Sequence, residues 1–233
     1  MKYEEKFVAK SSASRASFKV VLDQLIKEIV SDARATAKLT GYPEIQREVL
    51  QALKAIPRHE FVSRQNQVNA YTNRPLSIGY GQTISQPYIV ALMTAVLELN
   101  SRSKVLEVGT GCGYQTAVLA ELGKNVFTVE VISDLADRAQ NLLYRLGYTK
   151  INFRHGNGRN GWPECAPFQA ILVTAASENI PSTLVDQMDL DGRMVVPIGP
   201  KGGDQTLILL KKNKTGKVTK KKLIPVSFVP LIS

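Results

Sequence analysis

The segment from Lys104 to Glu130 constrains the fold of this chain more than any other. An apolar run, Val-Leu-Glu-Val, leads into the loop Gly109-Thr110-Gly111-Cys112-Gly113. A helix is expected to open at Tyr114, and a second apolar run ends at the acidic residue Glu130. Glycines let the backbone turn sharply and approach a ligand closely. A strand, a glycine-rich loop, a helix and a second strand with a terminal acid predict a nucleotide-binding α/β unit.

The spacing of the glycines indicates which nucleotide the loop accepts. It is Gly-x-Gly-x-Gly, whereas the longer dinucleotide motif seats a pyrophosphate at a helix N-terminus. The shorter loop, with acidic Glu107 on its strand, suits a ligand that has no phosphate and carries a cation. S-adenosylmethionine is such a ligand, and Glu130 is placed to accept both ribose hydroxyls. The alternative is that the glycines only form a tight turn between strand and helix.

Strand-like and helix-like segments alternate from residue 104 onward. The expected strands cover 104–109, 125–131, 151–155, 170–175, 193–198, 205–211 and 217–228, and the expected helices cover 114–122, 133–146 and 180–188. We expect Ser133 to cap its helix. The alternation requires a parallel sheet with right-handed crossovers, to which the C-terminal hairpin adds one antiparallel strand.

The first hundred residues are expected to be helical and loop-like. A polar, loosely ordered segment over residues 1–17 precedes apolar positions at helical spacing from Phe18 to Leu39 and from Glu44 to Ala55. Residues 57–87 have the composition of a loop, and a helix follows from Pro87 to Leu97 with proline in its first turn. A loop of that length inside a compact domain is often functional.

Composition favours a cytoplasmic protein without a membrane span. Two cysteines are too few for a disulfide framework, the N-terminal segment has no apolar core of a secretory signal, and the apolar runs are strand-sized. The net charge of +10 includes seven lysines between Lys211 and Lys222. These lysines lack the interleaved aromatic residues of single-strand nucleic-acid binders. We interpret them as a solvated hairpin protected from edge-to-edge pairing.

Several blocks of the chain resemble the protein-L-isoaspartate O-methyltransferase family. They are PLSIGYGQTISQP (Pro75–Pro87), LEVGTGCGYQTAVLA (Leu106–Ala120), and the blocks Arg154–Ala176, Val196–Gln205 and Val226–Leu231. Together they cover roughly residues 43–231. The resemblance implies a Rossmann-like, seven-stranded, S-adenosylmethionine-dependent methyltransferase sheet, mostly parallel with one antiparallel strand, preceded by N-terminal helices.

The resemblance also implies an activity. The family methylates the free α-carboxylate of L-isoaspartyl residues in damaged proteins, and the ester collapses to a succinimide whose hydrolysis restores some aspartate. The implied partners are isoaspartyl proteins and peptides, without a metal, a membrane or nucleic acid, and we expect a monomer. The expected organisation is a polar segment and extra helix over 1–40, a helical and substrate-loop region over 41–100, and the cofactor-binding core with its hairpin over 101–233.

The reacting centre is assigned by the resemblance to the loop from Thr83 to Pro87. The hydroxyl of Ser85 would orient the substrate carboxylate there, although serine also readily caps a following helix. A carboxylate with a pKa of about 4 is ionised at neutral pH and needs no general base, so alignment and exclusion of water remain as the catalytic contributions. The expected cofactor contacts are Thr83, Ile84, Ser85, Glu107, Gly109, Thr110, Gly111, Cys112, Gly113, Gln115, Glu130, Val131, Asn157 and Gly158.

Some residues depart from the family pattern. Asn157 stands where the family has an aspartate that accepts from the adenine amino group, and its carbonyl oxygen can still accept. Gln169 stands where an aspartate is common, and Cys112 replaces a common serine. Tyr80 and Asn73 also differ near the substrate loop. These departures concern substrate and turnover more than the fold.

The same sheet also supports methyltransferases that act on nucleic acids. Amino-methylating DNA enzymes carry Asn/Asp-Pro-Pro-Tyr/Phe after the fourth strand to hold a flipped base, whereas this chain has Thr174-Ala175-Ala176-Ser177. A Pro-Cys nucleophile of the cytosine C5 enzymes is also absent from the sequence. A methyltransferase for another carboxylate or small molecule, and a divergent S-adenosylmethionine-binding adaptor, remain open. An intact Thr-Ile-Ser-Gln-Pro loop favours an enzyme over an adaptor.

Overall fold

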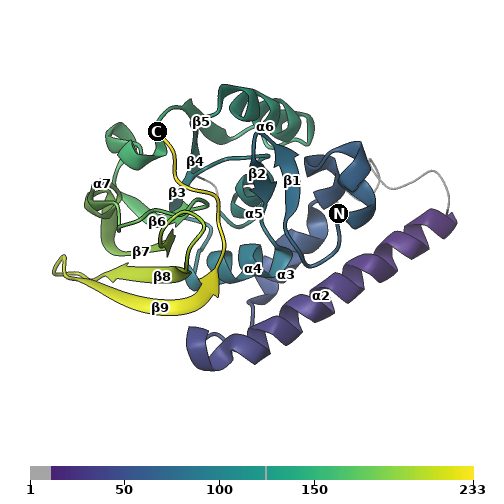
Figure 1. Ribbon diagram of the computed structural model, residues 1–233, viewed down its shortest axis with the longest axis horizontal. Helices are drawn as coiled ribbons and strands as arrows, with labels where there is room; N and C mark the ends of the chain where they lie inside the picture. Colours follow the sequence, from purple (N-terminus) through teal and green to yellow (C-terminus); the bar gives the residue numbers. More distant parts are fainter. Residues whose placement is uncertain (1–11, 124) are drawn as a thin grey trace.

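The computed structural model describes residues 12–123 and 125–233 (Figure 1). A seven-stranded sheet lies at the centre in the order β5-β4-β3-β6-β7-β8-β9. Neighbouring strands from β5 to β7 are parallel, and β8 runs antiparallel to both β7 and β9. The Rossmann-like sheet with one antiparallel strand is therefore confirmed.

The strand and helix bounds follow the predicted alternation, with one correction: the helix expected over 180–188 covers only Ser182–Asp186, and the strand expected over 193–198 already begins at Met188. The sheet strands are β3 Lys104–Val108, β4 Asn125–Glu130, β5 Ile151–His155, β6 Phe168–Val173, β7 Met188–Ile198, β8 Gln205–Lys212 and β9 Val218–Val226. The helices are α2 Ser12–Thr40, α3 Arg47–Ala55, α4 Pro87–Val96, α5 Tyr114–Leu122, α6 Ser133–Arg145 and α7 Ser182–Asp186. Short 3-10 turns are η1 Arg58–Phe61, η2 Arg64–Asn69, η3 Gly158–Asn160 and η4 Pro163–Cys165.

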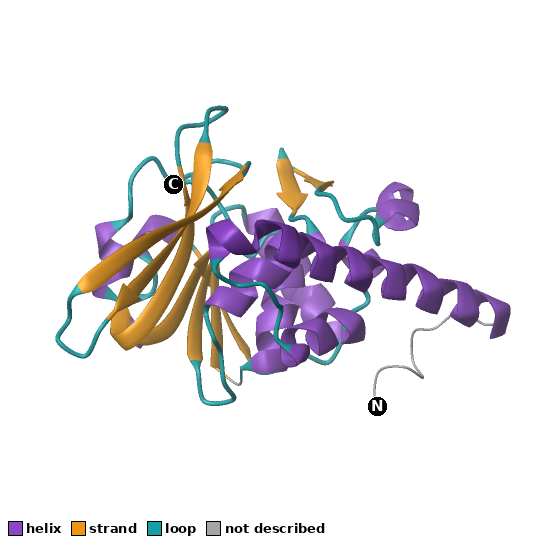
Figure 2. Ribbon diagram, turned by 90° about the horizontal axis from the view of Figure 1, so that it is seen from below, coloured by secondary structure: helices purple, strands orange, loops and turns teal. Residues whose placement is uncertain are grey.

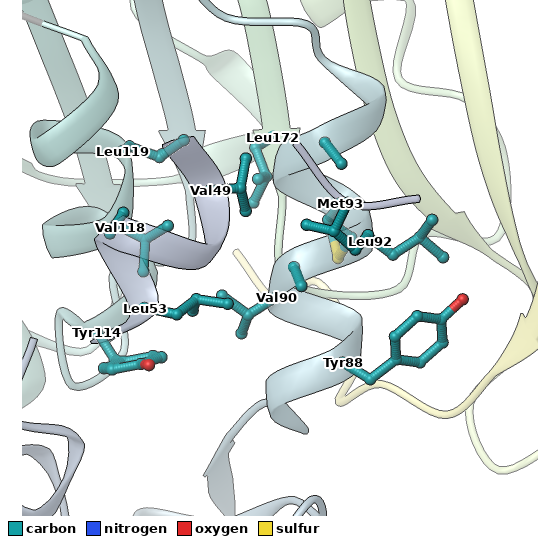
Figure 3. Close-up of a cluster of buried hydrophobic side chains, with 14 of the residues drawn as sticks. Val49, Leu53, Tyr88, Val90, Leu92, Met93, Tyr114, Val118, Leu119 and Leu172 are labelled. Carbon is teal, nitrogen blue, oxygen red and sulfur yellow. The ribbon is translucent and has the colours of Figure 1, made fainter. Parts of the chain in front are cut away.

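Apolar clusters cover both faces of the sheet, so that β3 and β6 are buried on both sides. Val105 joins a cluster with α3, α4 and α5, whereas the next residue, Leu106, joins a second cluster with α7. Figure 3 shows side chains from α3 (Val49, Leu53) and α4 (Val90) pointing toward one another in the first cluster. Helices on both faces are the expected cover for parallel strands with near-continuous apolar sequences.

The N-terminal helix is longer than predicted. α2 begins at Ser12, so residues 12–17 are helical rather than loosely ordered, and the rest of the predicted polar segment lies outside the described residues. No glycine or proline interrupts the sequence from Ser12 to Thr40, which lets the helix continue. Figure 2 shows α2 along the helical layer, with its N-terminal part extending past the rest of the molecule.

Residues 57–87 are more regular than the predicted loop. They contain η1, η2 and a two-stranded antiparallel hairpin, β1 Leu76–Gly79 and β2 Gln82–Ile84. The turn residues Gly79, Tyr80 and Gly81 all have positive φ, of 94°, 54° and 68°. Strands of three or four residues are too short to show a reliable alternation of apolar and polar side chains.

Two local predictions about the core region have different outcomes. Ser133 does not cap α6: the N-cap residue is Ile132, without a side-chain hydrogen bond, so that prediction is wrong. The lysine-rich hairpin does lie at the sheet edge, where β9 pairs with β8 alone among the described strands and exposes Lys220 to Lys222. None of the helices within residues 12–123 and 125–233 combines the length and the apolar character that a membrane span requires.

Candidate active site

A cavity with about 750 Å³ of space, part of it open to solvent, lies at the carboxyl ends of β3, β4 and β6. The strand order reverses at β3, because β4 lies on one side of it and β6 lies on the other. Parallel α/β sheets bind ligands at such a reversal. Predicted residues on its wall are Thr83, Ile84, Ser85, Gly109, Thr110, Gly111, Cys112, Gln115, Glu130, Val131 and Gly158. The structure therefore brings together four separate segments of the sequence, namely 83–85, 109–115, 130–131 and Gly158.

The glycine-rich loop forms the floor of the cavity. Gly109 has φ 95°, and a Cβ there would lie 2.2 Å from Oγ1 of Thr174, which donates hydrogen bonds to the carbonyls of Val108 and Gly109. Only glycine fits such a close approach between the ends of β3 and β6. Gly113 differs from its neighbours, because its missing Cβ would lie 2.8 Å from Leu143 of α6. The structure places Gly113 in helix packing rather than on the cavity wall.

Glu130 is the one charged side chain on the described wall of the cavity. Its Oε2 accepts from the backbone N–H of Gly111 at 2.8 Å, and its Oε1 accepts from those of Val131 and Ile132, each at 3.0 Å. A carboxylate offers about four lone-pair sites. These backbone donors fix the orientation of Glu130 and leave one site on Oε2, which is enough for one ribose hydroxyl rather than the two expected from the sequence.

Glu107 lies beneath the loop and away from the cavity. Its Oε2 accepts from the hydroxyls of Thr116 at 2.5 Å and Thr128 at 2.7 Å, whereas its Oε1 is buried without a hydrogen-bond partner among the described residues. Complete burial raises the pKa of Glu107 to about 8. The carboxyl group is therefore protonated at neutral pH, and Glu107 supports the loop through Thr128 and Thr110, whose hydroxyls are 2.6 Å apart.

Asn157 is also off the wall of this cavity. Its Oδ1 accepts from the backbone N–H of Arg159 at 2.9 Å and caps η3. The following residue, Gly158, does line the cavity, and a Cβ there would lie 2.4 Å from Val108. The predicted contact of Asn157 with adenine stays a prediction.

The C-terminal segment after β9 is a wall that the sequence did not identify. Residues 229–232 line the cavity. The segment is held by hydrogen bonds from Ala176 to Val229 at 2.8 Å and from Leu231 to Ala176 at 2.7 Å. Nη2 of Arg159 also donates to the carbonyl of Leu231 at 2.7 Å. The Val226–Leu231 block is the available signal, but spacing alone does not show that it reaches the glycine-rich loop.

Ser85 lines the same cavity and lies directly after β2 of the hairpin. The N-cap of α4 is Gln86, without a side-chain hydrogen bond, so Ser85 does not take the role of a cap. Within the described part of the chain, its hydroxyl has no hydrogen-bond partner, whereas its carbonyl accepts from Nη2 of Arg58 at 2.7 Å. The hydroxyl is therefore available to a ligand.

A model of the family described as "Protein-L-isoaspartate(D-aspartate) O-methyltransferase (PCMT)" matches residues 26–233 of the chain. The chain belongs to this family. "Protein-L-isoaspartate O-methyltransferase 2" of Syntrophobacter fumaroxidans is 48% identical over 208 residues, which are 89% of this chain and 84% of that protein.

Solved structures agree with this assignment to the O-methyltransferase family. A protein-L-isoaspartate O-methyltransferase structure superposes with a TM-score of 0.76 and 26% identity over 89% of this chain and 66% of that one. A structure from Plasmodium falciparum in complex with S-adenosyl-L-homocysteine has a TM-score of 0.74 and 24% identity, over 92% of this chain and 97% of that chain. The similarity to the Plasmodium falciparum structure shows that the two chains share a fold.

The departures from the methyltransferase family pattern have structural explanations at two positions. Gln169 lies at the amino end of β6, where Oε1 accepts from the backbone of Lys104 at 2.7 Å and Nε2 donates to Asp189 at 2.5 Å. This is the end of the strand opposite the cavity. Asn73 donates to Asp32 of α2 at 2.8 Å and accepts from the backbone of Tyr88 at 3.0 Å, which joins α2 to the start of α4.

The two histidines of this methyltransferase make contacts outside the cavity. Nδ1 of His59 lies 2.7 Å from the hydroxyl of Tyr71, and Nε2 of His155 lies 3.0 Å from the carbonyl of Val131. Neither histidine is among the described cavity-lining residues. Both side chains therefore contact other parts of the protein rather than the cavity.

Proposed function

We propose that this chain transfers a methyl group from S-adenosylmethionine to the free α-carboxylate of L-isoaspartyl residues in proteins and peptides. The observation that carries the proposal is that Glu130 and Ser85, whose hydroxyl has no hydrogen-bond partner among the described residues, line one cavity. Family membership and relatives named as protein-L-isoaspartate O-methyltransferases support the reaction class.

The charge of the cavity wall supports S-adenosylmethionine as the cofactor. Among the described lining residues there is no lysine or arginine, and Glu130 is the one acidic residue. A pyrophosphate would lack a cationic partner there, whereas a sulfonium is attracted by a negative wall. We assign the ribose to Glu130, the remainder of the cofactor to the loop from Gly109 to Cys112, and the sulfonium end to the loop from Thr83 to Ser85.

The reaction then needs orientation rather than proton transfer. When bound, S-adenosylmethionine supplies a methyl group on a cationic sulfur. The bond from this methyl to sulfur breaks as the carboxylate oxygen forms the new C–O bond, and the sulfur remains as a neutral thioether. The hydroxyl of Ser85 donates a hydrogen bond to the substrate carboxylate and aligns it with that methyl group. The apolar wall residues Val90 and Leu231 keep water from the carboxylate, whose charge disappears during transfer.

Substrate specificity tests this proposal. We would measure transfer of radiolabelled methyl from S-adenosylmethionine to an isoaspartyl peptide and to the same peptide with aspartate. Labelling of the isoaspartyl peptide alone is the expected result. Equal labelling of both peptides would indicate a less selective carboxyl methyltransferase, and labelling of neither would favour the cofactor-binding adaptor.

A further inference from the structure

Arg58 is a fully buried cation directly behind the cavity. It opens η1, and its side chain is 0% exposed. Nε donates to the carbonyl of Ala70 at 2.9 Å and Nη2 donates to the carbonyl of Ser85 at 2.7 Å. Its guanidinium carbon lies 4.6 Å from the ring centre of Tyr114, which lines the cavity. Arg58 therefore contacts two walls of the site without lining it.

The charge of Arg58 is not neutralised by the surrounding protein. Within the described residues it forms no ion pair with an aspartate or glutamate, and its buried Nη1 has no hydrogen-bond partner. Burial lowers the pKa of Arg58, yet a guanidinium stays protonated in proteins. Burial of an unpaired charge is destabilising. A ring contact with Tyr114 offsets only part of that cost.

We propose that Arg58 is a positioning residue for methyl transfer, which fixes the main chain of Ser85 and supplies positive potential to an anionic substrate in the cavity. This inference rests on the proposed function, because the anion is the substrate carboxylate. The fork of the guanidinium holds the carbonyls of Ala70 and Ser85 together and so fixes the main chain of Ser85 at the cavity wall. The uncompensated charge favours the ionised carboxylate at that hydroxyl.

The same charge has a consequence for the cofactor. S-adenosylmethionine carries a sulfonium, whereas S-adenosylhomocysteine has a neutral thioether at the same atom. A buried cation behind Ser85 disfavours the sulfonium relative to the thioether. Removal of the charge should therefore shift the ratio of the two affinities toward S-adenosylmethionine, which a purely structural arginine would not do.

The test compares Arg58→Met, which removes the charge, with Arg58→Lys, which keeps the charge but loses the planar fork. Arg64→Met, on the exposed η2 turn, is the matched control. For Arg58→Met we expect KM for the isoaspartyl peptide to rise by about tenfold to a hundredfold. The ratio of cofactor affinities should move by about threefold to tenfold toward S-adenosylmethionine. Arg58→Lys should keep the wild-type ratio and lower kcat.

A double-mutant cycle separates positioning from general support of the fold. If Arg58 acts through Ser85, Arg58→Lys should reduce kcat much less in a Ser85→Ala background than in the wild type. Equal losses in both backgrounds would overturn the positioning claim, and this readout survives a failure of Arg58→Met to fold. An unchanged KM and affinity ratio in folded Arg58→Met would overturn the charge claim. Absence of transfer by the wild type would instead refute the proposed function.

Discussion

The phenol of Tyr80 donates a hydrogen bond to the carboxylate of Asp134, with 2.5 Å between the oxygens. Arg138, one turn further along α6, donates to the same phenol oxygen at 3.1 Å and lies over the ring. Tyr80 is at the tip of the β1–β2 hairpin, and α6 follows Glu130 at the end of β4 (Figure 1). These contacts join the segment that carries Ser85 to the element that follows Glu130.

Tyr80→Phe should loosen the hairpin without altering the cavity wall. We expect S-adenosylhomocysteine to dissociate about threefold to tenfold faster, because a charge-assisted hydrogen bond that holds the hairpin is lost. Stopped-flow fluorescence, in which a competing ligand displaces bound S-adenosylhomocysteine, measures this rate. Tyr144→Phe, an exposed tyrosine on the same helix, is the control. An unchanged rate in Tyr80→Phe would show that the contact does not limit cofactor release.

Glu130→Gln should weaken cofactor binding. The amide presents N–H groups where the carboxylate accepts from backbone donors of Gly111, Val131 and Ile132. We expect the Kd for S-adenosylhomocysteine to rise by about tenfold to a hundredfold, measured by isothermal titration calorimetry. Exposed Glu178→Gln provides the comparison. Wild-type affinity in Glu130→Gln would remove Glu130 from the binding site.

Glu107→Gln should leave cofactor affinity nearly unchanged at neutral pH and should alter the pH dependence of stability. The pKa of Glu107 is raised to about 8 in the folded chain by burial, against about 4 when unfolded. The folded state therefore binds more protons between these values, and the free energy of unfolding falls as pH rises, by on the order of 1 kcal/mol per pH unit at most. Glutamine removes this contribution.

Urea unfolding of the wild type and Glu107→Gln from pH 5 to 8 measures that difference. The stability of Glu107→Gln relative to the wild type should increase with pH. A constant difference across this range would mean that Glu107 ionises normally in the folded protein.

Gln169→Asp should affect stability rather than catalysis. An aspartate could still accept from Lys104, but it would place a second carboxylate beside Asp189 and lose the donated hydrogen bond. We expect a loss of about 1 kcal/mol in the free energy of unfolding. KM for S-adenosylmethionine should stay at its wild-type value, since Gln169 lies at the far end of β6. A large rise in that KM would contradict this placement.

Local sequence patterns predict the central sheet and the glycine-rich loop well. β3 and β6 contain short apolar runs with clear boundaries, and such runs followed by glycine-rich turns are informative in a sequence. The β1–β2 hairpin escapes prediction because its strands are very short. Serine is a common N-cap residue, but Ser133 is already the first residue of α6. The backbone N–H groups of Val131 and Ile132, just before the helix, donate to Glu130 instead.

The sequence predicts the candidate site only where several lining residues come from one continuous segment, such as the glycine-rich loop. Spacing does not show which side of a loop faces a ligand, so the pattern cannot separate Glu107 and Gly113, which support the loop from behind, from the residues that line the cavity. Contacts between distant segments are also inaccessible to sequence patterns. The bond from Arg58 to the carbonyl of Ser85 and the position of residues 229–232 depend on tertiary packing.

Single-turnover methyl transfer to an isoaspartyl peptide by the wild type and Ser85→Ala tests the central claim most directly. Ser85→Ala should transfer methyl at least about tenfold more slowly, while its Kd for S-adenosylhomocysteine stays within about threefold of the wild type, because the hydroxyl aligns the carboxylate rather than holding the cofactor. Equal transfer rates for the two proteins, or no transfer by the wild type, would contradict the account.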